Sequence, residues 1–235
     1  MVQYMNDGRE FRYALDLSRK ILAEKADAGD TVTLNICGEY LEAIPMLTLF
    51  AFCLSEDGDL LSQWRAYCPT DGGYAIGFSL PKLQAIAKTA GLLLVPCEYE
   101  LQAQVDLLWP VLRDLLVDAR QLQVGEHMLL HPPHTWHLAR VGGAIKHPSF
   151  KEEREWRLIA VPSSFEGVKY RAHGSLIVPY LDLPIPKDGQ LIKEIVVGPC
   201  RYPDLALRSI RLMSAAQRGW PLKVTTARTP FRQLR

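Results

Sequence analysis

Two short segments of the chain carry polar side chains whose types and spacing suit ligand chemistry. The first covers residues 60–67, where a hydroxyl, an amide, a guanidinium and a phenol follow in close succession. An apolar stretch over residues 47–54 precedes it, and Gly72 and Gly73 follow it. Polar groups beside flexible backbone at the end of a buried strand are what a ligand pocket needs. The side chains expected to bind a ligand are Ser62, Gln63, Arg65, Tyr67 and Tyr74.

The same segment also has a purely structural interpretation. Trp64 would pack into the core, Arg65 would be a surface charge, and Gly72 with Gly73 would form a tight turn. We expect core burial for Trp64 itself and a binding site for the segment as a whole.

The second segment covers residues 151–157 and leads into a predicted strand over residues 155–161. Because side chains alternate along a strand, Glu153, Glu155 and Arg157 would share one face, which would look toward either solvent or a cleft. Most charge runs are solvated faces, whereas a carboxylate at a strand start can be aimed at a ligand. We therefore consider Glu155 and Glu153 as catalytic residues. Lys146 and Arg171 could add positive charge to a phosphate site, and surface positions are the alternative for both.

The elements that must position these segments follow an uneven order of helices and strands. Hydrophobic spacing and capping signals predict helices over residues 7–28, 38–45, 59–67, 81–90, 100–130, 134–146 and 203–217. Strands are predicted over residues 47–55, 73–79, 92–99, 155–161, 168–170, 176–181, 194–197 and 222–226. This order predicts an α+β fold with a mixed or antiparallel central sheet. We expect a single domain over residues 1–235, with a helical insertion over about residues 100–147.

Composition indicates an ordinary soluble globular protein with a sizeable core. The chain has 235 residues, of which 48% are hydrophobic and 23% are charged. A net charge of +1 gives no global field to attract nucleic acid or anionic membrane, although local RNA contact stays open. The chain has no apolar run of the roughly 18 residues needed to span a bilayer and no signal-like start. We therefore expect a cytoplasmic protein without membrane attachment.

Cysteine and histidine spacing gives no support for a metal site. The five cysteines form no CxxC pair, which fits reduced thiols in a cytoplasm. Cys53 and Cys97 are expected in the core, and a nucleophilic Cys68 is the less favoured alternative. Zinc would require the histidines near His134 and His137, but no H-E-x-x-H pattern occurs and solvated or capping histidines are favoured. P-loop, Rossmann and nucleophile-elbow motifs are also missing from the sequence.

Several short motifs together resemble one protein family. They are Met5-Asn6-Asp7 with Glu10, residues 59–65 with Tyr67, Ile76-Gly77-Phe78, Phe150 with residues 152–157, Val178-Pro179-Tyr180, Gly198-Pro199, and Pro230 with Arg232. This combination resembles a large, mostly bacterial family catalogued only as a domain of unknown function (number two-nine-seven-one). The similarity extends over nearly the whole chain. The family implies no reaction, so the chemistry must come from the residues.

A second, more distant resemblance concerns the strand opened by Glu155. A strand introduced by a glutamate, paired with an earlier region bearing Ser and Tyr, resembles ADP-ribosyltransferase folds. The resemblance implies that Glu155 holds the nicotinamide ribose of NAD and promotes glycosidic cleavage. Ser62 or Tyr67 would hold the ribose or nicotinamide, and Arg65 would meet the pyrophosphate with its forked donors. A carboxylate there would stabilise the positive charge that builds on the sugar.

Two hypotheses of function follow. The first is nucleotide chemistry resembling ADP-ribosyl transfer or NAD cleavage, in a bacterial toxin or phage-defence role, with NAD as substrate and a protein or nucleic-acid acceptor left open. The second is a non-catalytic ligand-binding or protein-interaction module in which the same residues form a structural polar network. The enzyme hypothesis requires the segment around Arg65 and the strand opened by Glu155 to line one cavity.

Overall fold

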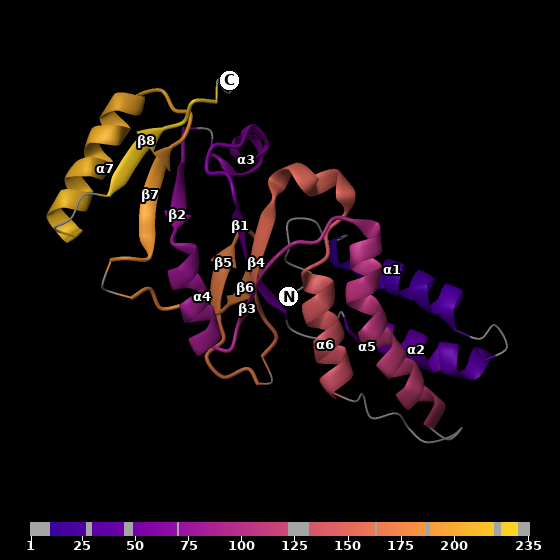
Figure 1. Cartoon of the computed structure of the whole chain (residues 1–235). Coiled ribbons are helices and arrows are strands. Elements are labelled where there is room, and N and C mark those ends of the chain that lie inside the picture. The colour runs from indigo at the N-terminus through magenta and orange to yellow at the C-terminus, as the bar shows by residue number, and fades with distance from the viewer. Residues whose placement is uncertain are drawn as a thin grey trace. The chain divides into compact units, whose positions relative to one another are not determined.

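The computed structural model describes residues 10–26, 30–44, 49–69, 71–121, 132–162, 164–186, 189–218 and 222–229. Within it the chain divides into two compact units. The first unit comprises Met1–Leu54 and Leu92–Asp182, and the second comprises Ser55–Gly91 and Leu183–Arg235. Figure 1 follows the chain by residue number through both units. The expected single domain depends on how the units associate and stays a prediction.

The first unit combines a group of helices with a three-stranded sheet. Its helices are α1 (Glu10–Lys25), α2 (Thr31–Ala43), α5 (Leu101–Gln121), α6 (Pro132–Gly143) and the 3₁₀ helix η3 (Pro148–Glu153). Its strands are β1 (Phe50–Ser55), β3 (Leu93–Pro96), β4 (Glu155–Ala160), β5 (Lys169–His173) and β6 (Leu176–Tyr180). The sheet order is β1-β4-β3, with β3 antiparallel to β4, and β5 and β6 form a separate antiparallel hairpin.

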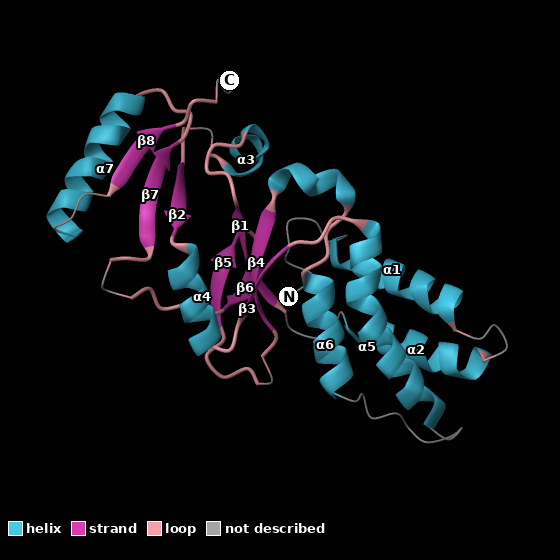
Figure 2. Ribbon diagram, viewed as in Figure 1, coloured by secondary structure: helices cyan, strands magenta, loops and turns pink. Residues whose placement is uncertain are grey.

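The core of the first unit lies among its four long helices, which contact one another (Figure 2). Leu41, Leu108, Leu112 and Ile145 have no exposed surface in this cluster. The buried positions of α5 recur at helical spacing and form one apolar face. Pro110, which in the sequence suggests a kink or break, does not end α5, because the helix continues through it to Gln121.

The second unit is a smaller sheet with helices. Its helices are α3 (Leu61–Tyr67), α4 (Leu80–Thr89) and α7 (Pro203–Arg218), and its strands are β2 (Tyr74–Phe78), β7 (Ile192–Val197) and β8 (Lys223–Thr226). The strand order is β2-β7-β8, with β2 antiparallel and β8 parallel to β7. Together the two units confirm the α+β fold with mixed and antiparallel sheets, and α5 and α6 confirm the helical insertion between strands β3 and β4.

Some local expectations need correction. The predicted short helix over residues 38–45 is longer, because the Asp30 side chain accepts a hydrogen bond from the Thr33 amide and starts α2 at Thr31. Strand β1 is not a buried strand, since Phe52 and Cys53 are both exposed, whereas Cys97 is buried as expected. The predicted start of the first helix at residue 7 and its predicted end at residue 28 lie outside the described residues. Within the described residues, no helix has the length and apolar character to cross a bilayer.

Candidate functional site

The second polar segment folds into a 3₁₀ helix followed directly by a strand. The His147 side chain accepts a hydrogen bond from the Ser149 amide and caps the start of η3. Arg154 then adopts a left-handed conformation with φ of 42°, which ends η3 and turns the chain into β4. Glu153 therefore closes a helix and does not belong to the strand, in contrast to the expected shared strand face. Glu155 is the first residue of β4.

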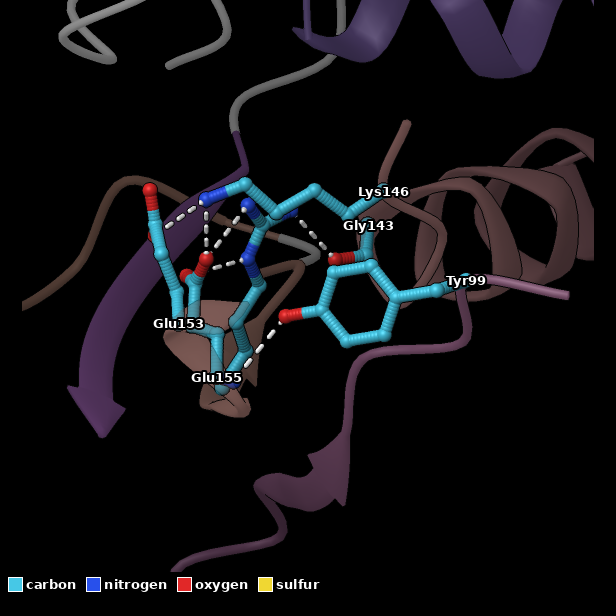
Figure 3. A network of polar contacts seen from close by, with 6 residues as sticks. Tyr99, Gly143, Lys146, Glu153 and Glu155 are labelled. Atoms are coloured by element: carbon cyan, nitrogen blue, oxygen red, sulfur yellow. Dashed lines mark hydrogen bonds and ion pairs between the residues drawn. The ribbon is translucent and has the colours of Figure 1, made fainter. Parts of the chain in front are cut away.

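Glu155 nevertheless meets Glu153, because both bind the same lysine (Figure 3). Lys146 Nζ donates to Glu155 Oε2 at 2.6 Å and to Glu153 Oε2 at 2.8 Å. Arg157 Nε donates to Glu155 Oε1 at 2.7 Å, and Arg157 Nη2 reaches Glu155 Oε2 at 3.3 Å. Lys146, Glu153, Glu155 and Arg157, here called the ionic cluster, thus contain two positive and two negative charges.

The ionic cluster is buried and tied to the backbone of the first unit. The side chains of Arg157, Lys146 and Glu155 are only 2%, 4% and 7% exposed, and that of Glu153 is 18% exposed. Arg157 Nη1 donates to the Gly143 carbonyl at 2.9 Å, which anchors the cluster to the end of α6 (Figure 3). The surface position considered for Lys146 is therefore wrong.

Backbone contacts explain how Lys146 is brought inward. Its amide donates to the Glu98 carbonyl at 3.1 Å. The side-chain amide of Gln104 donates to the carbonyls of both Glu98 and Lys146 at 2.8 Å. The Lys146 ammonium also lies 4.8 Å from the centre of the Phe150 ring, a cation–π distance. The lysine therefore reaches the cluster through contacts between residues distant in sequence.

The electrostatic surroundings keep Glu155 ionised. Burial by itself raises the pKa of a carboxyl group. Hydrogen bonds and charge from Arg157, with contributions from Cys53 and Lys146, outweigh burial and hold the pKa of Glu155 below its ordinary value. The Tyr99 hydroxyl accepts a hydrogen bond from the Glu155 amide at 3.0 Å, and burial raises the pKa of Tyr99 to about 12. At neutral pH an ionised Glu155 thus lies beside the protonated phenol of Tyr99.

The first polar segment lies in the second unit, where Trp64 is buried as expected. Its indole Nε1 donates to Asp59 Oδ1 at 2.8 Å. Asp59 Oδ2 accepts from the amides of Arg228 at 2.6 Å and Thr229 at 3.3 Å, and the Asp59 carbonyl accepts from the Thr229 hydroxyl at 2.8 Å. Asp59 therefore joins α3 to the segment after β8. We call Asp59, Trp64, Arg228 and Thr229 the Asp59 clasp.

Glycine at position 198 allows Trp64 to pack on strand β7. A Cβ at Gly198 would lie 2.6 Å from the Trp64 ring and 3.0 Å from the Gly73 carbonyl oxygen. The Gly198 amide donates to that same carbonyl at 2.8 Å. Trp64 and Gly198, which both belong to the family motifs, thus have a direct packing explanation.

The proposed binding residues differ in accessibility. Arg65, Tyr67 and Tyr74 are exposed, and Gln63 is half-buried. The Ser62 hydroxyl is buried and has no hydrogen-bond partner among the described residues. All five residues belong to α3 or β2 of the second unit. Because Glu155 belongs to the first unit, a cavity shared by the two polar segments stays a prediction.

Arg171 and the histidines lie apart from the ionic cluster. The Arg171 guanidinium sits 5.8 Å from the centre of the Tyr180 ring on the β5–β6 hairpin. His134 Nε2 lies 2.5 Å from Asp118 Oδ2, which links α6 to α5. Across the described part of the chain, no group of three or more His, Cys, Asp and Glu side chains is arranged to hold a metal ion.

The comparison with protein families gives one match. A family model described as "Protein of unknown function (DUF2971)" matches residues 63–158. Residues 63–158 are thus similar to this family. The resemblance to this family is confirmed over that segment, which includes Trp64 and the whole ionic cluster, whereas Ser62 and Arg171 lie outside it. No curated protein and no solved structure matches the chain significantly.

Sequence reasoning missed several residues that build the cluster. Tyr99 and Gly143 contact Glu155 and Arg157 directly, and Gln104 supports the cluster through the Lys146 carbonyl. These residues lie 14 to 56 positions away from their partners along the chain. The DUF2971 motif around Glu155 gives no local signal for these partners. The Asp59 clasp was missed for the same reason, since 169 residues separate Asp59 from Arg228.

Proposed function

We propose that the chain is a non-catalytic ligand-binding or protein-interaction module in which the ionic cluster serves structure. The observation that carries this proposal is the enclosure of Glu155. Both of its carboxylate oxygens bind cations, and its side chain is 7% exposed. A catalytic glutamate must reach the sugar of its substrate, and this carboxylate is already occupied by Lys146 and Arg157.

The energetic cost of freeing Glu155 supports the structural role. Moving its carboxylate toward a substrate would leave Lys146 and Arg157 buried without their shared partner. Breaking a buried ion pair by removing one partner costs about 3–5 kcal/mol. An enzyme would need to supply this energy in every catalytic cycle, whereas a structural cluster keeps its contacts.

The accessible polar groups of the second unit are better suited to binding. Arg65 presents a guanidinium, and Tyr67 and Tyr74 present phenol rings that are 56% and 52% exposed. A guanidinium binds anionic groups with paired donors, and aromatic rings offer rigid contact area. These residues would contact a small nucleotide ligand or a partner protein.

NAD cleavage or ADP-ribosyl transfer is the second candidate function, in the toxin or phage-defence role considered above. Two observations favour it. The lowered pKa keeps Glu155 in the ionised form that this chemistry needs, and Glu153 is the most exposed member of the ionic cluster. In this alternative Glu153 would face the substrate, and Glu155 would fix Lys146 beside it.

Incubation of the full chain with NAD distinguishes the two functions. We expect no release of nicotinamide and no rise in Tm with NAD, while Glu155→Gln and Glu153→Gln change only stability. The enzyme proposal would replace the module proposal if nicotinamide is released and Glu155→Gln or Glu153→Gln abolishes the release. The Tm and the circular dichroism of the variant must then be unchanged. Addition of bacterial lysate and labelled NAD would then identify a protein or nucleic-acid acceptor.

A further inference from the structure

Helix α7 of the second unit has an apolar inner face that packs on the sheet. Figure 2 shows the helix alongside strands β7 and β8. Ala206, Leu207 and Ile210 pack against the cluster formed by residues of these strands. The cluster residues are Ile195, Val197 and Val224. This face alone accounts for how α7 is held in the fold.

The opposite face of α7 carries large apolar side chains that are exposed. Leu205 and Leu212 are 60% and 73% exposed, and Tyr202, just before the helix, is 58% exposed. A helix at a protein surface ordinarily carries polar residues on its outer face. A contiguous apolar stripe on the outside indicates an interaction surface.

The spacing of the outer stripe matches that of a helix-pairing seam. Leu205, Ser209, Leu212 and Ala216 follow in steps of four, three and four residues, and Tyr202 lies three residues before Leu205. This is the heptad spacing by which one helix packs against another. Small side chains at Ser209 and Ala216 let a second helix approach closely. The four positions, here called the α7 seam, extend over roughly 16 Å along the helix.

The segment that carries the α7 seam has a net positive charge. Residues 201–216 contain three arginines and one aspartate, a net charge of +2, whereas the whole chain carries +1. Among the described residues, no carboxylate forms an ion pair with Arg201, Arg208 or Arg211. Arg211 donates only to the Val224 carbonyl, at 3.4 Å, and Arg201 lies over the Tyr202 ring.

We propose that the α7 seam binds an amphipathic helix of a partner protein whose apolar stripe is flanked by acidic residues. Carboxylates on the partner would pair with Arg208 and Arg211 while leucines pack on Leu205 and Leu212. If two copies of α7 paired antiparallel with Leu205 of one against Leu212 of the other, the two Arg208 side chains would lie close together. Their repulsion favours a different protein as the partner. The narrow heptad stripe favours a helix over a membrane surface. This inference goes beyond the proposed function, because it uses no residue of α3 or the ionic cluster.

A labelled synthetic peptide of three heptads tests the proposal, with leucine at the two core positions of each heptad and glutamate at the flanking positions. A matched peptide carries lysine at the same flanking positions. Fluorescence anisotropy with the full chain should show binding of the glutamate peptide that weakens with salt. The lysine peptide should bind at least about tenfold more weakly. Leu205→Ser with Leu212→Ser should cause a loss of similar size.

Ile177→Ser on the β5–β6 hairpin is the matched control, since Ile177 is also a highly exposed apolar residue. It should leave peptide binding unchanged, and none of the three substitutions should lower Tm because all the side chains are exposed. Failure of the glutamate peptide to bind, or equal binding of both peptides, would overturn the proposal. Two further results would also overturn it by assigning the seam to another occupant. One is dimerisation in sedimentation experiments that Leu212→Ser prevents. The other is seam-dependent binding to phosphatidylglycerol vesicles without binding of the peptide.

Discussion

Substitution of Glu155 by glutamine is the most direct perturbation of the ionic cluster. Glutamine keeps the size of the side chain and removes one of two negative charges. Within the ionic cluster Glu153 is then the one carboxylate for Lys146 and Arg157, whose side chains are 4% and 2% exposed. The variant therefore gives the buried cluster one more positive than negative charge.

The expected loss of stability is large. Removing one partner of a buried ion pair costs about 3–5 kcal/mol. In a protein of this size each kcal/mol lowers Tm by about 2–4 °C, so Tm should fall by about 6–20 °C. The total stability of a native protein is about 5–15 kcal/mol, so the expected loss is a large fraction of it.

Thermal unfolding followed by circular dichroism measures this loss. Glu100→Gln is a matched control, because Glu100 also pairs with a lysine, Lys151, but both side chains are 66% exposed. Screening by water should leave the Tm of the control nearly unchanged. Lys146→Met in the Glu155→Gln background restores a neutral cluster and should recover part of the loss.

Two outcomes would refute this reasoning. The first is a Tm for Glu155→Gln within the range of the Glu100→Gln control. The second is a double variant whose loss equals the sum of the two single losses. Such additivity would mean that Lys146 and Glu155 are energetically independent, in spite of the 2.6 Å contact between them.

Three further outcomes follow from the contacts described above. Gly198→Ala should destabilise the protein by about 1–3 kcal/mol, measured by urea unfolding, because its Cβ would lie 2.6 Å from the Trp64 ring. Asp59→Ala should remove the acceptor of the Thr229 amide, and hydrogen exchange at that amide should accelerate. Because the folded pKa of Glu155 is lowered, its stabilising contribution is complete above the unfolded pKa of about 4.3 and disappears as pH falls through the folded value. The difference in Tm between wild type and Glu155→Gln should therefore be constant near neutral pH and shrink as the pH falls below about 4.3.

The order of helices and strands could be predicted because local signals determine it. Helix α4 begins with Pro81 in its first turn, and the apolar positions of α5 repeat at helical spacing. Local signals failed where tertiary packing decides the outcome. Pro110 does not end α5, since the residues on both sides of it are held in the core, and β1 is apolar in sequence but exposed at Phe52.

The candidate site could be predicted only in part. Alternation along a strand correctly indicated that Glu155 and Arg157 share a face, and they bind each other directly. The burial of Glu155 and Arg157 could not be predicted, because it depends on partners from another part of the chain. Lys146, just after α6, binds Glu155, and the Gly143 carbonyl accepts a hydrogen bond from Arg157. A charged sequence normally indicates a solvated surface, and here mutual neutralisation allows four charges to lie together inside the protein.

The path of the chain through the two units limits how this protein can be shortened. Both units are discontinuous, and residues far outside the DUF2971 match complete them. A fragment cut at residues 63 and 158 would lose α1 and α2 from one core, strands β7 and β8 from the other, and both sides of the Asp59 clasp. Expression of the fragment bounded by the matched region should yield insoluble material, whereas longer chains that keep both flanks should yield folded protein.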